Sequence, residues 1–132
     1  MILVIDASAA VEYLLQTGIG LRVAGMLQGA TLLAPALLDA EVLAVVRREV
    51  LGHRLRVERG AEAVADLRDW GLERVAHREL LDAAWSLRGH VSAYDALYVA
   101  VARTRGGALV TADAALARAP ALGVAVHNVR LS

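Results

Sequence analysis

The sequence predicts an α/β domain of three layers, in which a central, mainly parallel β-sheet is flanked by helices. Short, wholly apolar runs such as Ile2–Ile5 are typical of strands that are buried on both faces. These runs alternate with longer segments whose apolar residues recur at helical spacing, and this alternation favours a parallel sheet. With 132 residues, of which 58% are hydrophobic, the chain can bury one full core, so we expect a single domain over residues 1–132.

The expected elements follow from the apolar runs and from the residues that break helices. Strands are expected at 2–5, 31–34, 72–76, 108–111 and 124–129. Helices are expected at 9–15, 21–28, 36–51, 57–70, 80–87, 92–104 and 114–119. Gly18 and Gly20 should end the first helix, Pro35 should close the second strand, and Gly52 lies beyond the end of the third helix.

The charge balance and two absent residue types exclude several classes of protein. Fourteen arginines balance fourteen acidic residues, which excludes binding of nucleic acid by bulk positive charge. The lack of cysteine excludes disulfides, thiolate metal sites and cysteine nucleophiles, and the lack of lysine excludes Schiff bases and phosphate-loop lysines. We find neither a signal-peptide pattern nor an uninterrupted apolar stretch of membrane-spanning length, so we expect a cytoplasmic protein with no membrane partner.

Two acidic residues directly follow predicted strands. Asp6 comes after the first strand, with Ser8 two positions later, and Asp113 follows the strand that ends at Thr111. In an open parallel sheet, ligands bind at the carboxyl ends of the strands, where the strand order reverses. The two acids should therefore lie at the same edge of the sheet.

Two further acids lie in apolar helical segments and have no basic residue within one turn. Asp95 is the sole charged residue of segment 92–102, and the neighbours of Glu41 one helical turn away are apolar. A buried lone carboxylate is costly, so each should pair, become neutral or bind a cation. Carboxylates that converge without an arginine repel one another, and a hard cation such as Mg²⁺ relieves the repulsion. Such a cluster suits metal-dependent hydrolysis of phosphodiester bonds.

Each of these acids also has a purely structural explanation. Asp6 or Ser8 could cap the first helix, and Asp113 could cap the short helix after it. Ser92 and Asp95 fit a capping box. Glu41 could be a solvated position on a helix that is only partly buried.

The segments that carry the acids resemble the PIN-domain family, in particular the toxin ribonucleases of VapBC-type toxin–antitoxin systems. The resemblance covers essentially the whole chain. It rests on Val4–Ser8, on Glu41 in the helix after Ala34-Pro35, on Ser92–Ala102 and on Leu109–Asp113. The segment Ser92–Ala102 is the most specific of these.

The resemblance implies a PIN-like fold, a Mg²⁺ or Mn²⁺ site, cleavage of RNA, and a cognate antitoxin protein that blocks the site. It implies a catalytic quartet of Asp6, Glu41, Asp95 and Asp113. Asp6, Asp95 and Asp113 would be the metal ligands, supported by the hydroxyls of Ser8 and Thr111. Some relatives carry a further acid where this chain has Ala114 and Ala115, so the number of metal ions stays open.

An arginine cluster is a candidate RNA contact. Arg47, Arg48 and Arg54 lie around the end of the third helix, where phosphate contacts would orient RNA without reading its sequence. Glu49 and Glu58 could equally balance these charges in an ordinary charged helix end. Separately, the high apolar content predicts a homodimer that buries on the order of 800 Å² per subunit.

Other functions fit parts of the same pattern. A phosphoaspartate protein, either a signalling receiver or a haloacid-dehalogenase-type phosphatase, also places acids after parallel strands around Mg²⁺. Both families depend on a lysine, and the phosphatase pattern needs a second aspartate where Ser8 stands. A dinucleotide-binding fingerprint at Gly18-Ile-Gly20 fails because its third glycine would fall at Val23. A non-catalytic PIN-like module that only binds protein stays open.

Overall fold

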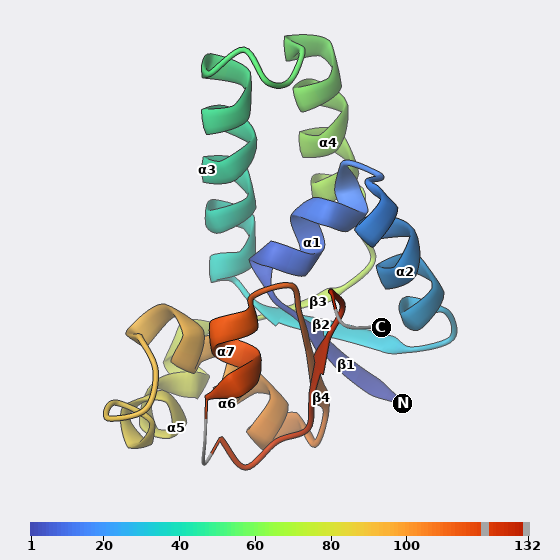
Figure 1. Ribbon diagram of the computed structural model, residues 1–132. Helices are drawn as coiled ribbons and strands as arrows, with labels where there is room; N and C mark the ends of the chain where they lie inside the picture. The colour runs from blue at the N-terminus through green and yellow to red at the C-terminus, as the bar shows by residue number, and fades with distance from the viewer. Residues whose placement is uncertain (120–121, 131–132) are drawn as a thin grey trace.

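The computed structural model describes residues 1–119 and 122–130, and its elements form the three predicted layers (Figure 1). In this part of the chain a five-stranded parallel sheet has the order β3-β2-β1-β4-β5. Its strands are β1 (Ile2–Ile5), β2 (Thr31–Pro35), β3 (Glu73–Val75), β4 (Ala108–Thr111) and β5 (Val126–Asn128). The prediction of a mainly parallel sheet flanked by helices is therefore confirmed.

Helices form the connections between the strands and cover both faces of the sheet. They are α1 (Ala7–Leu14), α2 (Gly18–Leu27), α3 (Leu37–Leu51), α4 (Val57–Asp69), α5 (Leu81–Ser86), α6 (Ala93–Arg105) and α7 (Ala114–Arg118), with a 3-10 turn η1 (His77–Leu80) before α5. Helices α1 to α4 contact one another above the sheet as Figure 1 is drawn. Helix α6 lies below the sheet, where it packs against β1, β2, β4 and α5.

The strand order reverses beside β1. The chain forms β1, β2 and β3 in one direction and then returns to pair β4 with the other edge of β1, with Ile5 opposite Val110. A crevice at the carboxyl ends of the strands is expected at such a reversal. Asp6 follows β1 and Asp113 follows β4, so both acids lie at this point on neighbouring strands, as predicted.

The core is densest where β1, β4 and α6 meet. Val4 and Ile5 of β1 and Leu109 and Val110 of β4 are fully buried. Helix α6 is apolar nearly all round because it is buried from Tyr98 to Ala102. Side chains that leave the carboxyl ends of these elements therefore start from a rigid backbone.

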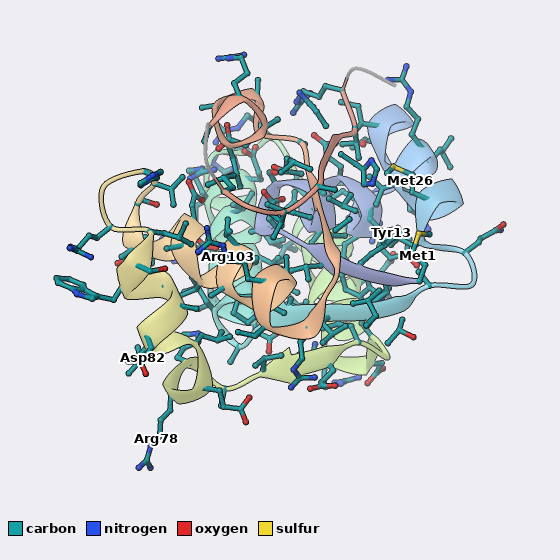
Figure 2. The ribbon with its side chains drawn as sticks, turned by 90° about the horizontal axis from the view of Figure 1, so that it is seen from below. Met1, Tyr13, Met26, Arg78, Asp82 and Arg103 are labelled. Carbon is teal, nitrogen blue, oxygen red and sulfur yellow. The ribbon has the colours of Figure 1, made fainter. Side chains whose placement is uncertain are left out.

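Helix α6 is also fixed near its C-terminus by the side chain of Arg103, which is labelled in the view from below (Figure 2). Arg103 donates from Nε to the carbonyl oxygen of Leu122 at 2.7 Å, and from its guanidinium to the Ser86 hydroxyl at 3.3 Å. Gly106 then ends the helix in the left-handed conformation, with a φ of +71°. The helix that carries Asp95 is thus anchored at the end opposite to that residue.

The first helix ends at Leu14, one residue before its predicted end, but the role predicted for Gly18 and Gly20 is wrong, because both belong to the second helix. Gly18 begins α2, whose N-terminus is capped by Thr17 through a hydrogen bond from the Gly20 amide at 3.0 Å. The chain turns before α2 at Gln16, which has a φ of +57°. A Cβ at Gly20 would lie 2.0 Å from the carbonyl oxygen of Glu12, so this glycine permits the close approach of α1 and α2.

The other differences from the prediction are small. The expected helix at 80–87 divides into η1 and α5, and the expected last strand at 124–129 shortens to β5. In the described residues, no helix combines the length and apolar character that crossing a membrane requires.

Candidate active site

The carboxylate of Asp6 caps α1 and also lies at the strand reversal. Its Oδ1 accepts hydrogen bonds from the Ala9 amide at 3.0 Å and the Ser8 hydroxyl at 2.7 Å, and its Oδ2 accepts one from the Thr111 hydroxyl. A carboxylate has about four acceptor positions, so one remains for a further ligand. The capping explanation of Asp6 is correct, and it leaves room for a functional role.

The hydroxyls of Ser8 and Thr111 connect Asp6 to the loop after β4. The Ser8 hydroxyl accepts a hydrogen bond from the Ala112 amide at 2.9 Å, and the Thr111 hydroxyl accepts one from the Asp113 amide at 2.9 Å. Thr111 is completely buried. These bonds hold Asp6 and the start of the Asp113 loop in a fixed relation, as the resemblance implied for the two hydroxyls.

Asp113 lies at the exposed rim of this loop. Its Oδ1 accepts a hydrogen bond from the Ala115 amide at 2.9 Å and so caps α7. The capping explanation is therefore correct for Asp113 as well. A short polar side chain can cap a helix and can also lie at the carboxyl end of a strand, where ligands bind, because the two positions coincide here.

Asp95 lies in the first turn of α6, where the Ser92 hydroxyl accepts a hydrogen bond from its amide at 3.1 Å. Burial raises the pKa of Asp95, and repulsion from Asp113 and Glu41 raises it further, while a hydrogen bond with Ser92 opposes the rise. The capping pattern of Ser92 is thus confirmed. The charge of Asp95 is therefore coupled to acids on α3 and on the loop after β4.

The pKa of Asp6 is also raised. Burial is the main cause, and the charge of Asp95 adds to it, while the hydrogen bonds from Thr111, Ser8 and Ala9 oppose it. Asp95 therefore repels Asp6 as well as Glu41 and Asp113. Asp6 and Asp113 thus follow neighbouring strands, and the charge of Asp95 is coupled to those of Asp6, Glu41 and Asp113.

Glu41 enters the same region from α3 and contacts a residue that the sequence analysis did not single out. Its Oε1 accepts a hydrogen bond from the hydroxyl of Tyr98 at 2.7 Å. Burial first, and then Glu41, raise the pKa of Tyr98, so the phenol stays protonated. One signal could have found it: Tyr98 lies three positions after Asp95, on the same face of α6.

The donor set fits a hard divalent cation. Across residues 1–119 and 122–130, the arginine ion pairs involve other acids and none of the four. Within the same residues, no group of three or more Asp, Glu or His side chains is placed so that it could hold a metal ion by itself. Mg²⁺ needs one or two protein carboxylates and keeps several waters, so the arrangement suits this ion better than one that requires a closed cage.

The arginine cluster lies apart from the acids. Arg54 pairs with Glu49 at 2.5 Å, in agreement with the charged-helix-end explanation, whereas Arg47 and Arg48 are exposed on α3. Helix α3 rises about 15 Å from Glu41 to its last residue, Leu51. It points away from the sheet (Figure 1), so Arg54 lies beyond the reach of the acids.

The chain belongs to the PIN-domain family, whose model matches residues 3–122. Among its relatives, Ribonuclease VapC1 of Mycobacterium tuberculosis is 39% identical over 129 residues, which cover 96% of this chain and 97% of that protein. Ribonuclease VapC12 of the same organism is 35% identical over 116 residues, which cover 88% of this chain and 90% of that protein. The predicted family is confirmed, and the phosphoaspartate alternative is set aside.

Two solved structures share the fold. VapBC2 from Rickettsia felis, bound to a DNA fragment from its promoter, aligns with a TM-score of 0.69 at 15% identity, covering 96% of this chain and 98% of that one. PAE2754 from Pyrobaculum aerophilum aligns with a TM-score of 0.67 at 22% identity, covering 98% of this chain and 85% of that one. At these identities the similarity shows the three-layer PIN fold.

Proposed function

We propose that this chain is a divalent-metal-dependent endoribonuclease, and that it is the toxin of a VapBC-type toxin–antitoxin system. The relatives that match it over nearly their whole length are named VapC ribonucleases. The observation that carries the proposal is the placement of Asp6 and Asp113 after the neighbouring strands β1 and β4, linked through the hydroxyls of Ser8 and Thr111. Repulsion by Asp95 helps to raise the pKa of Asp6, and repulsion by Glu41 and Asp113 helps to raise that of Asp95. Such repulsion is maintained in a fold where a cation compensates it.

Each acid would have a distinct task. Asp6 and Asp95 would be the direct ligands of Mg²⁺ or Mn²⁺, with Asp113 as a further carboxylate beside them. The ion would supply positive charge for a phosphate oxygen and lower the pKa of a water. Ser8 and Thr111 hold the Asp6 carboxylate in position, so little reorganisation is needed when RNA binds. Glu41 or Asp113 would orient the water that attacks the phosphodiester and accept its proton.

The charged side chains also indicate the substrate and the partner protein. RNA phosphates would contact Arg47, Arg48 and Arg54, of which Arg54 would first have to leave Glu49. A cognate antitoxin would block the site by compensating the acids with an arginine. An enzyme with this substrate and this partner would act in the cytoplasm. We also propose that the chain forms a homodimer.

An RNA cleavage assay with Mn²⁺, with and without EDTA, tests the proposed function. We expect cleavage by the wild type that EDTA abolishes and that added Mn²⁺ restores, and we expect no cleavage by Asp95→Asn. Cleavage that resists EDTA would contradict the metal-dependent mechanism. Absence of cleavage by well-folded wild type under all these conditions would instead favour a PIN-like module that only binds protein.

A further inference from the structure

We propose that Tyr98 is a positioning residue for RNA cleavage and that it acts through Glu41, whose carboxylate it holds beside the other acids. The inference rests on the proposed ribonuclease function and deepens it. None of the sequence motifs assigns a role to the phenol. Its geometry does, through the contact that it makes between the two helical layers.

The two residues come from opposite faces of the sheet. Glu41 projects from α3, which packs with α1 and α4 above the sheet, and Tyr98 projects from α6, which packs below it (Figure 1). The hydroxyl of Tyr98 donates to Oε1 of Glu41 at 2.7 Å, between residues 57 positions apart. The bond therefore connects the helix that carries Asp95 to the helix that carries Glu41.

Tyr98 is suited to holding another side chain in place. Only 1% of the residue is exposed, and its successors Val99 and Ala100 are fully buried, so the ring has no room to change its orientation. Glu41 is only partly buried and lies on a helix that has other exposed positions. A glutamate side chain has several rotatable bonds and loses rotamer freedom when it is fixed. The rigid phenol thus restricts the flexible carboxylate before RNA arrives, which is the usual requirement for a precise site.

The hydrogen bond also orients the carboxylate of Glu41. Because the phenol stays protonated, it donates to Oε1 and uses one acceptor position of that oxygen. Oε2 makes no hydrogen bond to another described residue, so it is the oxygen better placed to accept a proton from the attacking water. Tyr98 lies three positions after Asp95 on α6, about one helical turn away, so the phenol is on the side of the helix that carries a proposed metal ligand.

The test begins with Tyr98→Phe, which removes one hydroxyl and keeps the buried ring. We expect kcat for RNA cleavage to fall at least about tenfold, with KM changed less than about twofold, because the lost hydroxyl orients a general base and does not contact RNA. Affinity for Mn²⁺, measured by calorimetry, should change less than about twofold, since the proposed ligands remain. Tyr13→Phe is the matched control: Tyr13 is a partly buried tyrosine of α1 that stacks on Trp70 with ring centroids 4.9 Å apart, and the change should be neutral in all three measurements.

A double-mutant cycle with Glu41→Gln separates positioning from general stability. If Tyr98 acts through Glu41, Tyr98→Phe should lower kcat by less than about twofold in the Glu41→Gln background. If the losses multiply, or if Tyr98→Phe cleaves RNA as the wild type does, the positioning role is wrong. Melting temperatures of all variants identify any loss of activity that comes from unfolding. If Glu41→Gln does not fold, Glu41→Asp replaces it in the cycle, because the shorter side chain keeps the charge but moves it away from the phenol. Failure of the wild type to cleave RNA would instead overturn the proposed function itself.

Discussion

The carboxylate of Asp6 has a fixed orientation because two hydroxyls and one backbone amide donate to it. The same side chain caps α1 and follows β1, so the proposed metal ligand is also a helix cap. Asp113 likewise follows β4 and caps α7. A capping function is therefore no argument against a metal-binding function at the end of a parallel strand.

Substitution of Asp95 by asparagine should remove activity without removing stability. The carboxylate is repelled by Asp113 and Glu41, so its neutral isostere relieves unfavourable charge in the metal-free protein. We expect Asp95→Asn to abolish RNA cleavage while its melting temperature at pH 7 equals or exceeds that of the wild type. A marked drop in melting temperature would indicate that Asp95 is mainly a helix-capping residue.

The raised pKa values of Asp6 and Asp95 predict how the difference in melting temperature between Asp95→Asn and wild type depends on pH. Above the unfolded-state pKa of about 3.9, the folded protein retains more protons than the unfolded chain, so these groups lower stability as pH rises. The melting temperature of Asp95→Asn relative to wild type should therefore increase between about pH 4 and pH 7. Added Mg²⁺ should reduce this difference by stabilising only the wild type, which thermal melts at several pH values would show.

The two glycines Gly20 and Gly25 of α2 should respond differently to substitution by alanine. A Cβ at Gly20 would collide with the Glu12 carbonyl, whereas nothing lies within 4 Å of a Cβ placed at Gly25 of the same helix. Gly20→Ala should cost at least about 2 kcal/mol through overpacking. Gly25→Ala should gain about 0.5–1 kcal/mol because alanine favours the helix. Urea unfolding of the two variants checks both values, and equal effects would refute the close approach of α1 and α2.

The start of α3 depends on a side chain that is distant in sequence. The residue at its N-cap position is Ala36, whose side chain makes no hydrogen bond to the helix. The Leu37 amide donates instead to Nε2 of His77 at 2.9 Å. We expect His77→Ala to destabilise the protein by about 1 kcal/mol in urea unfolding. The exposed His90 supplies the control, since His90→Ala should have almost no effect. If both variants unfold alike, His77 does not cap α3.

At the scale of the whole molecule, exposed apolar side chains on α5 and at the start of α6 support the proposed homodimer. Leu81, Trp85 and Tyr94 are 57%, 68% and 62% exposed. We expect light scattering at micromolar concentration to give the mass of a dimer, and Trp85→Glu to shift it toward the monomer. Val57, at the start of α4, is 63% exposed, so Val57→Glu is a control that should leave the mass unchanged. A monomeric wild type would refute the dimer.

The amino-acid sequence by itself determined the fold class and singled out the four acids as candidates for the site. Buried parallel strands are wholly apolar and short, and an acid after such a strand or inside an apolar helix contrasts with its neighbours, so local pattern was sufficient. Family membership followed from the same segments. Arg54 shows what local pattern could not decide. Its partner Glu49 was present in the sequence, but the pattern fitted an RNA contact as well as an ordinary charged helix end.

Only the tertiary structure decided how Glu41 is held, what caps α3 and why Gly20 is a glycine. The hydrogen bond from Tyr98 to Glu41 joins residues 57 positions apart, and the one from Leu37 to His77 joins residues 40 positions apart. Gly20 must be a glycine because a Cβ there would collide with a backbone atom of α1. Local pattern carries no information about such contacts, because they depend on how the elements pack and not on the spacing of residues within one element.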